Sequence, residues 1–204
     1  MIASAGEQAV QIIPGLLWVA FAAVVLAVFY RPIRDDLIPR LSMLKLPGGV
    51  ELALFDRVTS AAQKQNVTIS YEDKSRIVRR LERSSELLRG ARILWVDDHP
   101  ENNSDEAAIL SAFGVSIQFA TTTQKALDLL SSERFDVVIS DSEREGRPDE
   151  GLRFLDETKG IPWTILYIGD YKPELGTPRY AFGITNRPHQ LLHYVLDALE
   201  RQRG

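Results

Sequence analysis

The sequence predicts an α/β domain with a doubly wound, five-stranded parallel sheet, preceded by one transmembrane helix. The runs Ile93–Val96 and Phe135–Ser140 are short and apolar, and each is followed at once by aspartate. Runs of this length between segments of helical periodicity are typical of strands buried on both faces of a parallel sheet. An uncharged stretch of 23 residues, Gln8–Tyr30, predicts the transmembrane helix.

The uncharged stretch is long enough to cross a bilayer, which takes about 20 apolar residues in a helix. Trp18 and Phe29-Tyr30 lie toward its two ends, where aromatic rings favour the membrane interface. A cleaved signal peptide is the competing interpretation. The segment before the apolar run carries Glu7 and no basic residue, and no small-residue cleavage site follows the run, so a permanent anchor is favoured.

Basic residues around the span predict its orientation. None precedes the span, and four follow it closely: Arg31, Arg34, Arg40 and Lys45. Because such residues collect on the cytoplasmic side, we expect residues 1–7 outside and the C-terminal part in the cytoplasm, in a single-pass protein of the inner (cytoplasmic) membrane. Ala23 and Ala27 have the small-residue spacing of packed membrane helices, which leaves a homodimer as an open alternative.

The juxtamembrane segment, residues 31–70, contains a turn signal. Alternating runs lie on either side of Pro47-Gly48-Gly49. This pattern predicts a small hairpin over residues 44–55, which would have to pack on another surface because an isolated hairpin is marginally stable in water.

Residues 71–90 have a helical pattern. Ile77, Leu81 and Leu88 share one face, and Gly90 ends the pattern. We expect a linker helix that either pairs with a second copy of the chain or lies against the domain that follows.

Charge and cysteine content exclude two classes of function. Residues 91–204 carry 12 basic and 19 acidic side chains, which makes this half a poor binder of nucleic acid. Residues 1–90 carry 12 basic and 9 acidic side chains, a balance that suits the anionic inner leaflet of a membrane. The absence of cysteine excludes a disulfide scaffold. The expected environment is therefore a membrane surface and not a nucleic acid.

From residue 91 onward, strand and helix patterns alternate as a doubly wound sheet requires. We expect strands at Ile93–Val96, Val115–Phe119, Phe135–Ser140, Ile161–Ile168 and Ala181–Thr185. Helices are expected at about 103–113, at about 122–132, from Gly151 onward, and from Pro188 to about Gln202. Between the last two strands, prolines and glycine break any helical run: Pro173, Gly176 and Pro178. The expected strand order is 2-1-3-4-5.

Three aspartates follow two of these strands. Asp97 and Asp98 come directly after the first strand, and Asp141 comes directly after the third. Ligands of open α/β sheets bind outside the carboxyl ends of the strands, so these carboxylates should collect at one edge. Such a site favours a hard cation such as Mg²⁺. Beside a divalent ion, an aspartate can attack a phosphoryl group.

These residues and their spacing resemble the receiver domain of two-component response regulators. Members of that family carry an acidic pair after the first strand and a phosphate-accepting aspartate after the third. The resemblance covers about residues 91–204 and implies a flavodoxin-like fold. It implies that Asp141 is the phosphoacceptor, that Asp97, Asp98 and Asp141 bind Mg²⁺, and that a histidine kinase or a phosphotransfer protein is the partner.

The sequence departs from the family pattern beside this site. Family members carry a lysine before a proline at the fifth strand; here Arg187 precedes Pro188, and the resemblance implies a cationic role for it and a cis peptide bond. The Ser or Thr that holds a phosphate oxygen is replaced by Tyr167 or Ile168, and the aromatic switch position is Ile184. The usual relay from phosphate to output surface is therefore altered.

Three functions are compatible with these features. The favoured one is a membrane-anchored, receiver-like protein of a phosphorelay, with Mg²⁺-assisted phosphorylation of Asp141. The alternative is a pseudo-receiver that is not phosphorylated and acts as a protein-interaction scaffold at the membrane. An enzyme with Asp141 as nucleophile is disfavoured, because the sequence contains no glycine-rich phosphate loop and no evident general base. We therefore expect no enzymatic activity of its own.

Overall fold

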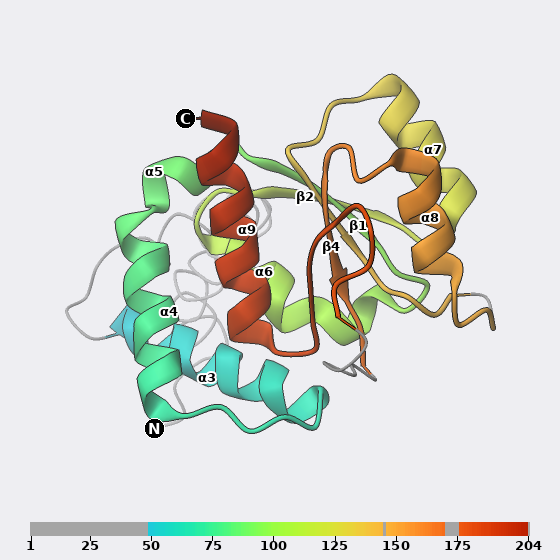
Figure 1. The fold of residues 1–204 in the computed structure, drawn as a ribbon. Coiled ribbons are helices and arrows are strands. Elements are labelled where there is room, and N and C mark those ends of the chain that lie inside the picture. Colours follow the sequence, from blue (N-terminus) through green and yellow to red (C-terminus); the bar gives the residue numbers. More distant parts are fainter. Residues whose placement is uncertain (1–48, 145, 170–175, 204) are drawn as a thin grey trace, which may run out of the picture. The chain divides into compact units, whose positions relative to one another are not determined.

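The computed structural model describes residues 49–144, 146–169 and 176–203. They form a parallel five-stranded sheet in the order β2-β1-β3-β4-β5, which confirms the predicted order (Figure 1). The strands are β1 (Arg92–Val96), β2 (Ser116–Ala120), β3 (Val137–Ser140), β4 (Trp163–Tyr167) and β5 (Ala181–Thr185). All five coincide with the predicted strands to within two residues at either end.

Helices cover both faces of the sheet (Figure 1). One face carries α6 (Ser104–Ala112), which follows the short 3₁₀ helix η2 (Pro100–Asn103), and α9 (Pro188–Arg203). The other face carries α7 (Thr123–Ser132) and α8 (Glu150–Thr158). Between β4 and β5 the described residues 176–180 form no helix, as the breakers in this stretch predicted, and residues 170–175 lie outside the described ranges.

The continuous apolar runs of the strands are explained by burial on both faces. Ile93 and Trp95 of β1 belong to the core under α6 and α9, whereas Leu94 and Val96 belong to the core under α7 and α8. Successive side chains of a strand point to opposite faces, so a strand covered on both sides favours apolar residues along most of its length. The aspartates come directly after β1 and β3, where each strand ends.

The hairpin prediction does not hold for its second half. Residues 49–55 are the first turns of helix α3 (Gly49–Lys64), while residues 44–48 lie outside the described ranges. Leu54, Val58 and Ala61 recur at intervals of three or four residues, and all three are buried in the domain. This helical spacing outweighs the Pro-Gly-Gly turn signal because the apolar face of α3 has a surface to cover.

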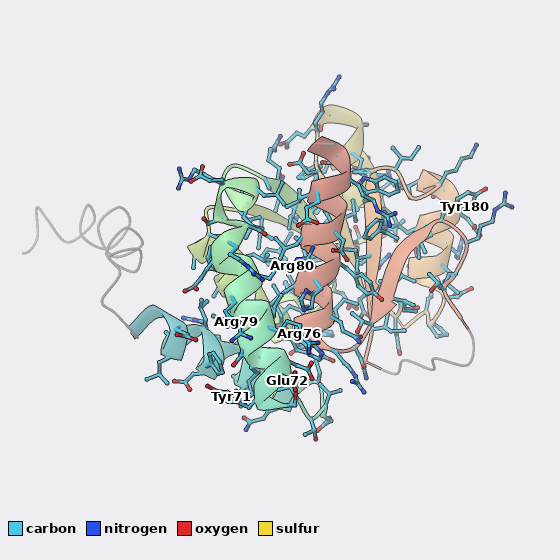
Figure 2. All side chains as sticks on the ribbon, turned by 60° about the vertical axis from the view of Figure 1, so that its left-hand side comes forward. Tyr71, Glu72, Arg76, Arg79, Arg80 and Tyr180 are labelled. Carbon is cyan, nitrogen blue, oxygen red and sulfur yellow. The ribbon has the colours of Figure 1, made fainter. Side chains whose placement is uncertain are left out.

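The segment predicted as a linker helix contains α4 (Tyr71–Arg83) and α5 (Ser85–Leu88). Ser70 caps α4, its hydroxyl accepting a hydrogen bond from the Asp73 N–H at 3.1 Å. Figure 2 shows α4 alongside α9, with Arg80 between them. Arg80 donates to Asp197 and Glu200 of α9, the latter at 3.1 Å. Of the two alternatives for this segment, it lies against the domain that follows it.

The predicted transmembrane span, Gln8–Tyr30, falls outside the described residues. Within the part that the structure describes, no helix combines the length and the apolar character needed to cross a membrane.

Candidate metal centre

The three predicted aspartates meet at the carboxyl edge of the sheet. β1 and β3 are parallel neighbours, with Val96 opposite Ser140, so the residues that follow these two strands are brought side by side. Asp97, Asp98 and Asp141 each offer a carboxylate oxygen, and the three oxygens lie within 4.8 Å of one another. We call these residues the acidic trio.

Asp97 is buried and held by two hydrogen bonds. The His99 N–H donates to Oδ1 at 2.7 Å, and the Asn103 side-chain amide donates to Oδ2. Asn103 occupies the N-cap position of α6, but its side chain makes no capping bond there. The sequence did not indicate this role, because an asparagine before a helix is normally interpreted as its cap.

Asp141 is half-buried and is held by the backbone of the loop that follows it. The Ser142 N–H donates to its Oδ1 at 2.6 Å, and the Glu143 N–H also donates to the carboxylate. Burial, together with the charge of Asp97, raises the pKa of the Asp141 carboxyl to about 6. Both causes oppose a negative charge on Asp141, and a bound cation would relieve them.

Helix α8 reaches this loop through a glycine. A Cβ on Gly151 would come within 2.5 Å of the Asp141 carbonyl oxygen, so no larger residue fits at this position. The Gly151 N–H donates to the Ser142 carbonyl at 2.9 Å, which ties the loop to the first turn of the helix.

Arg144, which sequence reasoning missed, is fully buried beneath the same loop. Its Nη1 donates to the Ser140 hydroxyl at 2.8 Å and to the Asp141 carbonyl. Its Nη2 donates to the Thr123 hydroxyl at 3.1 Å, and its guanidinium lies 5.9 Å from the ring centroid of Phe154. One basic residue in a strongly charged loop gives no sequence signal of burial.

Arg187, by contrast, is exposed and is not among the residues that line the cavity at the acidic trio. Its carbonyl accepts from the Leu191 N–H at 3.0 Å at the start of α9, and its charge lowers the pKa of Asp73, whose main cause of lowering is the Ser70 hydroxyl. The expected cis bond before Pro188 is also absent; in the described residues the cis peptide is Ile161–Pro162. The trans geometry suits Pro188 as the first residue of a helix.

Tyr167 ends β4 and borders the cavity, yet its hydroxyl is committed elsewhere. It donates to Glu106 of α6 at 2.7 Å, and a hydrogen bond from Gln65 reaches the same hydroxyl. Burial raises the pKa of both Tyr167 and Glu106. Tyr167 is therefore neutral, and ionisation of the Glu106 carboxyl is disfavoured. Tyr167 therefore cannot stand in for the serine or threonine of the family pattern in this conformation.

The acidic trio opens into a cavity of about 610 Å³. Loops after β1, β3 and β4 line it, together with Gln65 beyond the end of α3: His99, Asn102, Asn103, Ser142, Glu143, Gly146, Pro148, Ile168 and Gly169. Carboxylate oxygens at one side of an open, polar cavity suit Mg²⁺, which takes oxygen ligands and retains several waters. The donor set thus fits the expected ion.

No protein-family model and no curated protein matches the chain. Similar solved structures include the chemotaxis response regulator CheY4 of Vibrio cholerae, at 22% identity and TM-score 0.46, covering 54% of this chain and 98% of that chain. The signal receiver domain of an HD domain-containing protein from Pseudomonas fluorescens has 26% identity and TM-score 0.48, covering 56% and 90%. The response regulator TrrA from Thermotoga maritima, solved with Mg²⁺ and BeF, has 24% identity and TM-score 0.46, covering 53% and 98%. These similar structures are response-regulator receiver domains.

Proposed function

We propose that this chain is a receiver-like protein of two-component signalling that accepts a phosphoryl group on Asp141. The observation that carries the proposal is the convergence of three carboxylate oxygens, from the ends of two adjacent strands, within 4.8 Å at the carboxyl edge of a 2-1-3-4-5 sheet. Asp97, Asp98 and Asp141 would hold Mg²⁺.

In the proposed reaction, an Asp141 carboxylate oxygen attacks the phosphorus of a phosphohistidine. The new O–P bond forms as the N–P bond breaks, and the donor imidazole leaves with the electron pair and takes up a proton. The Ser142 and Glu143 N–H groups orient the attacking carboxylate, and Asn103 holds Asp97 beside it. When bound, Mg²⁺ supplies positive charge that offsets the repulsion between the phosphoryl group and the carboxylates.

The partner we propose is a histidine kinase or a phosphotransfer protein, and the site of action is the cytoplasmic face of the inner membrane. The span Gln8–Tyr30 and the basic residues after it support this location. We propose no enzymatic activity beyond the acceptance and loss of the phosphoryl group.

The test is a calorimetric titration of the full-length chain with Mg²⁺, and then with beryllofluoride, a phosphoryl mimic, in the presence of Mg²⁺. We expect saturable binding of both in the unaltered chain and loss of mimic binding in Asp141→Asn. Asp156→Asn, which removes an exposed carboxylate from α8, is the matched control and should bind like the unaltered chain. Absence of mimic binding in the unaltered chain would refute phosphorylation.

A second candidate function is that of a scaffold that binds a protein partner without being phosphorylated. Two observations favour it: the Tyr167 hydroxyl is bonded to Glu106, and Arg187 is exposed away from the cavity lining. Binding of Mg²⁺ without binding of beryllofluoride in the same titration would support this function over phosphorylation.

A further inference from the structure

The burial of Arg144 needs a physical explanation. The side chain is fully buried, yet the hydrogen bonds that it donates among the described residues all go to neutral oxygens. The ion pairs described for this region use Arg147 and Arg153, which bridge to Glu150 at 3.7 and 3.6 Å, and not Arg144. Its Nε has no partner in the described part of the chain. A buried guanidinium without a contacting carboxylate is costly, so a nearby charge must compensate for it.

The charges that compensate are those of Asp141 and Glu150, followed by those of the other two members of the acidic trio. Burial lowers the pKa of Arg144, while Asp141, then Glu150, Asp97 and Asp98, act against this lowering. The attraction is mutual, since Arg144 counteracts the rise in the pKa of Asp141. Arg144 also contacts Asp141 through the backbone, because Nη1 donates to the neutral Asp141 carbonyl oxygen and not to the carboxylate.

The residue expected to balance these acids lies elsewhere. Arg187 is exposed at the start of α9, and its charge acts on Asp73 and His189. Arg147 and Arg153 are exposed and directed at Glu150. Among the described residues, Arg144 is a buried cation whose guanidinium donates to the Asp141 carbonyl oxygen.

We propose that Arg144 is the built-in counter-charge of the acidic trio, a positioning residue that allows three carboxylates to converge before any ligand arrives. It acts through charge on the trio and through the Asp141 carbonyl on the loop after β3. With Arg144 present, the net negative charge at the cavity is smaller than that of the three carboxylates alone. The site therefore binds a divalent cation more weakly than it would without Arg144.

Two substitutions separate charge from hydrogen bonding at this position. Arg144→Gln retains N–H donors for the Ser140 hydroxyl and the Asp141 carbonyl but removes the charge. Arg144→Lys retains the charge but cannot donate to both sides of the guanidinium fork. Arg147→Gln removes an exposed charge from the same loop and is the matched control.

The first measurement needs no metal. Thermal unfolding of the full-length chain in chelator is compared for Asp141→Asn made alone and made together with each Arg144 variant. Asp141→Asn changes Tm by one amount in the unaltered chain and by another in the Arg144→Gln variant. We expect the second change to be more positive than the first by about 4 °C or more, because the trio in that variant has no counter-charge. In the Arg144→Lys and Arg147→Gln backgrounds the effect of Asp141→Asn should be unchanged. Equal effects in every background would overturn the proposal.

The second measurement rests on the proposed function, since it uses Mg²⁺. At low ionic strength we expect Arg144→Gln to lower the Kd for Mg²⁺ by roughly five- to tenfold and Arg144→Lys to leave it near the original value. A purely structural role would instead weaken Mg²⁺ binding in both variants. If the unaltered chain binds no Mg²⁺, the proposed metal centre fails, while the metal-free measurement still decides the role of Arg144.

Discussion

Asp141 lies where burial and the charge of Asp97 both oppose its ionisation, which raises its pKa to about 6 from the ordinary 3.8. A folded-state pKa above the unfolded value means that the folded protein binds the proton more tightly. The resulting stabilisation is complete below about 3.8 and is lost as the pH rises through about 6. At neutral pH the charged carboxylate therefore lowers the stability of the metal-free domain.

The first prediction follows from this sign. We expect Asp141→Asn to raise the free energy of unfolding of the metal-free protein at about pH 8 by about 1 to 2 kcal/mol, a value reduced to allow for partial exposure. The gain should shrink toward about pH 3, below the unfolded-state value of 3.8, where the carboxyl is protonated in both states. Urea unfolding in chelator at both pH values measures it, with Asp156→Asn as control. A gain independent of pH would contradict the electrostatic cause.

Tyr167 allows a second prediction at the scale of a residue. Tyr167→Phe removes the donor to the Glu106 carboxyl, whose other oxygen has no partner among the described residues. We expect a loss of about 1 to 3 kcal/mol in the free energy of unfolding. The affinity for Mg²⁺ should stay within about twofold, since the hydroxyl is bonded to Glu106 and Gln65. Tyr71→Phe, at an exposed tyrosine of α4, is the control, and a selective loss of Mg²⁺ binding would contradict this account.

At the scale of elements, the contact between α4 and α9 contains a titratable group. His193 Nδ1 lies 3.0 Å from Arg80 Nη1, so the ring accepts from the guanidinium in its neutral form. Burial, and then the positive charge of Arg80, lower the pKa of His193, while Asp197 and Asp73 act in the opposite direction. Because the folded-state pKa is depressed, the associated stability is complete above about 6.5 and is lost as the pH falls below that value.

We therefore predict that His193 contributes a downward slope to the free energy of unfolding of the metal-free chain as the pH falls below about 6.5, a slope opposite in sign to that of Asp141. His193→Gln keeps an acceptor for Arg80 and should reduce this slope. His99→Gln, at an exposed loop histidine, should leave it unchanged. Equal slopes for all three proteins would show that the α4–α9 contact does not sense protonation.

The elements of the sheet were predictable because their signals are local. The apolar run Ile93–Val96 predicts a buried strand without information from distant parts of the chain. The aspartates that directly follow it mark the edge of the sheet at which the strand ends. Helix α3 was missed because the turn signal at residues 47–49 was given more weight than the spacing of Leu54 and Val58. The helical spacing of these apolar residues determines the structure only where another surface of the domain buries them.

The site residues divide in the same way. The acidic trio could be predicted because its residues directly follow two predicted strands. The roles of Asn103 and Arg144 depend on their burial, which results from packing between distant segments and cannot be predicted from the local sequence. Arg187 was assigned by resemblance to lysine-containing relatives. In the structure its side chain is exposed, and its charge contributes to lowering the pKa of Asp73 in α4, after the Ser70 hydroxyl.

At the scale of the whole molecule, the core extends beyond the segment that resembles a receiver domain. Leu54 and Val58 of α3 and Ile77, Val78 and Leu81 of α4 are buried in the same cluster as residues of β1, α6 and α9. The compact unit accordingly begins at residue 47 and runs to residue 204. A fragment cut to the resemblance alone would expose part of this core.

Truncation tests this. We expect a fragment of residues 47–204 to unfold cooperatively, and a fragment of residues 71–204 to lose about 3 to 6 kcal/mol through the loss of Leu54 and Val58 alone. Urea unfolding followed by Trp95 fluorescence compares the two. The substitution Leu52→Ala in the longer fragment is the control, since Leu52 is 65% exposed on α3. Equal stability of both fragments would contradict a shared core.

Gln65 gives the architecture its broadest consequence. It lines the cavity of the acidic trio and bonds to the Tyr167 hydroxyl, and just before it Lys64 of α3 bridges to Asp105 of α6 at 2.8 Å. Part of the lining of this cavity thus comes from the residue that directly follows α3. A displacement of the C-terminal end of α3 would therefore move Gln65, and by thermodynamic reciprocity a ligand in contact with Gln65 would favour one position of that end.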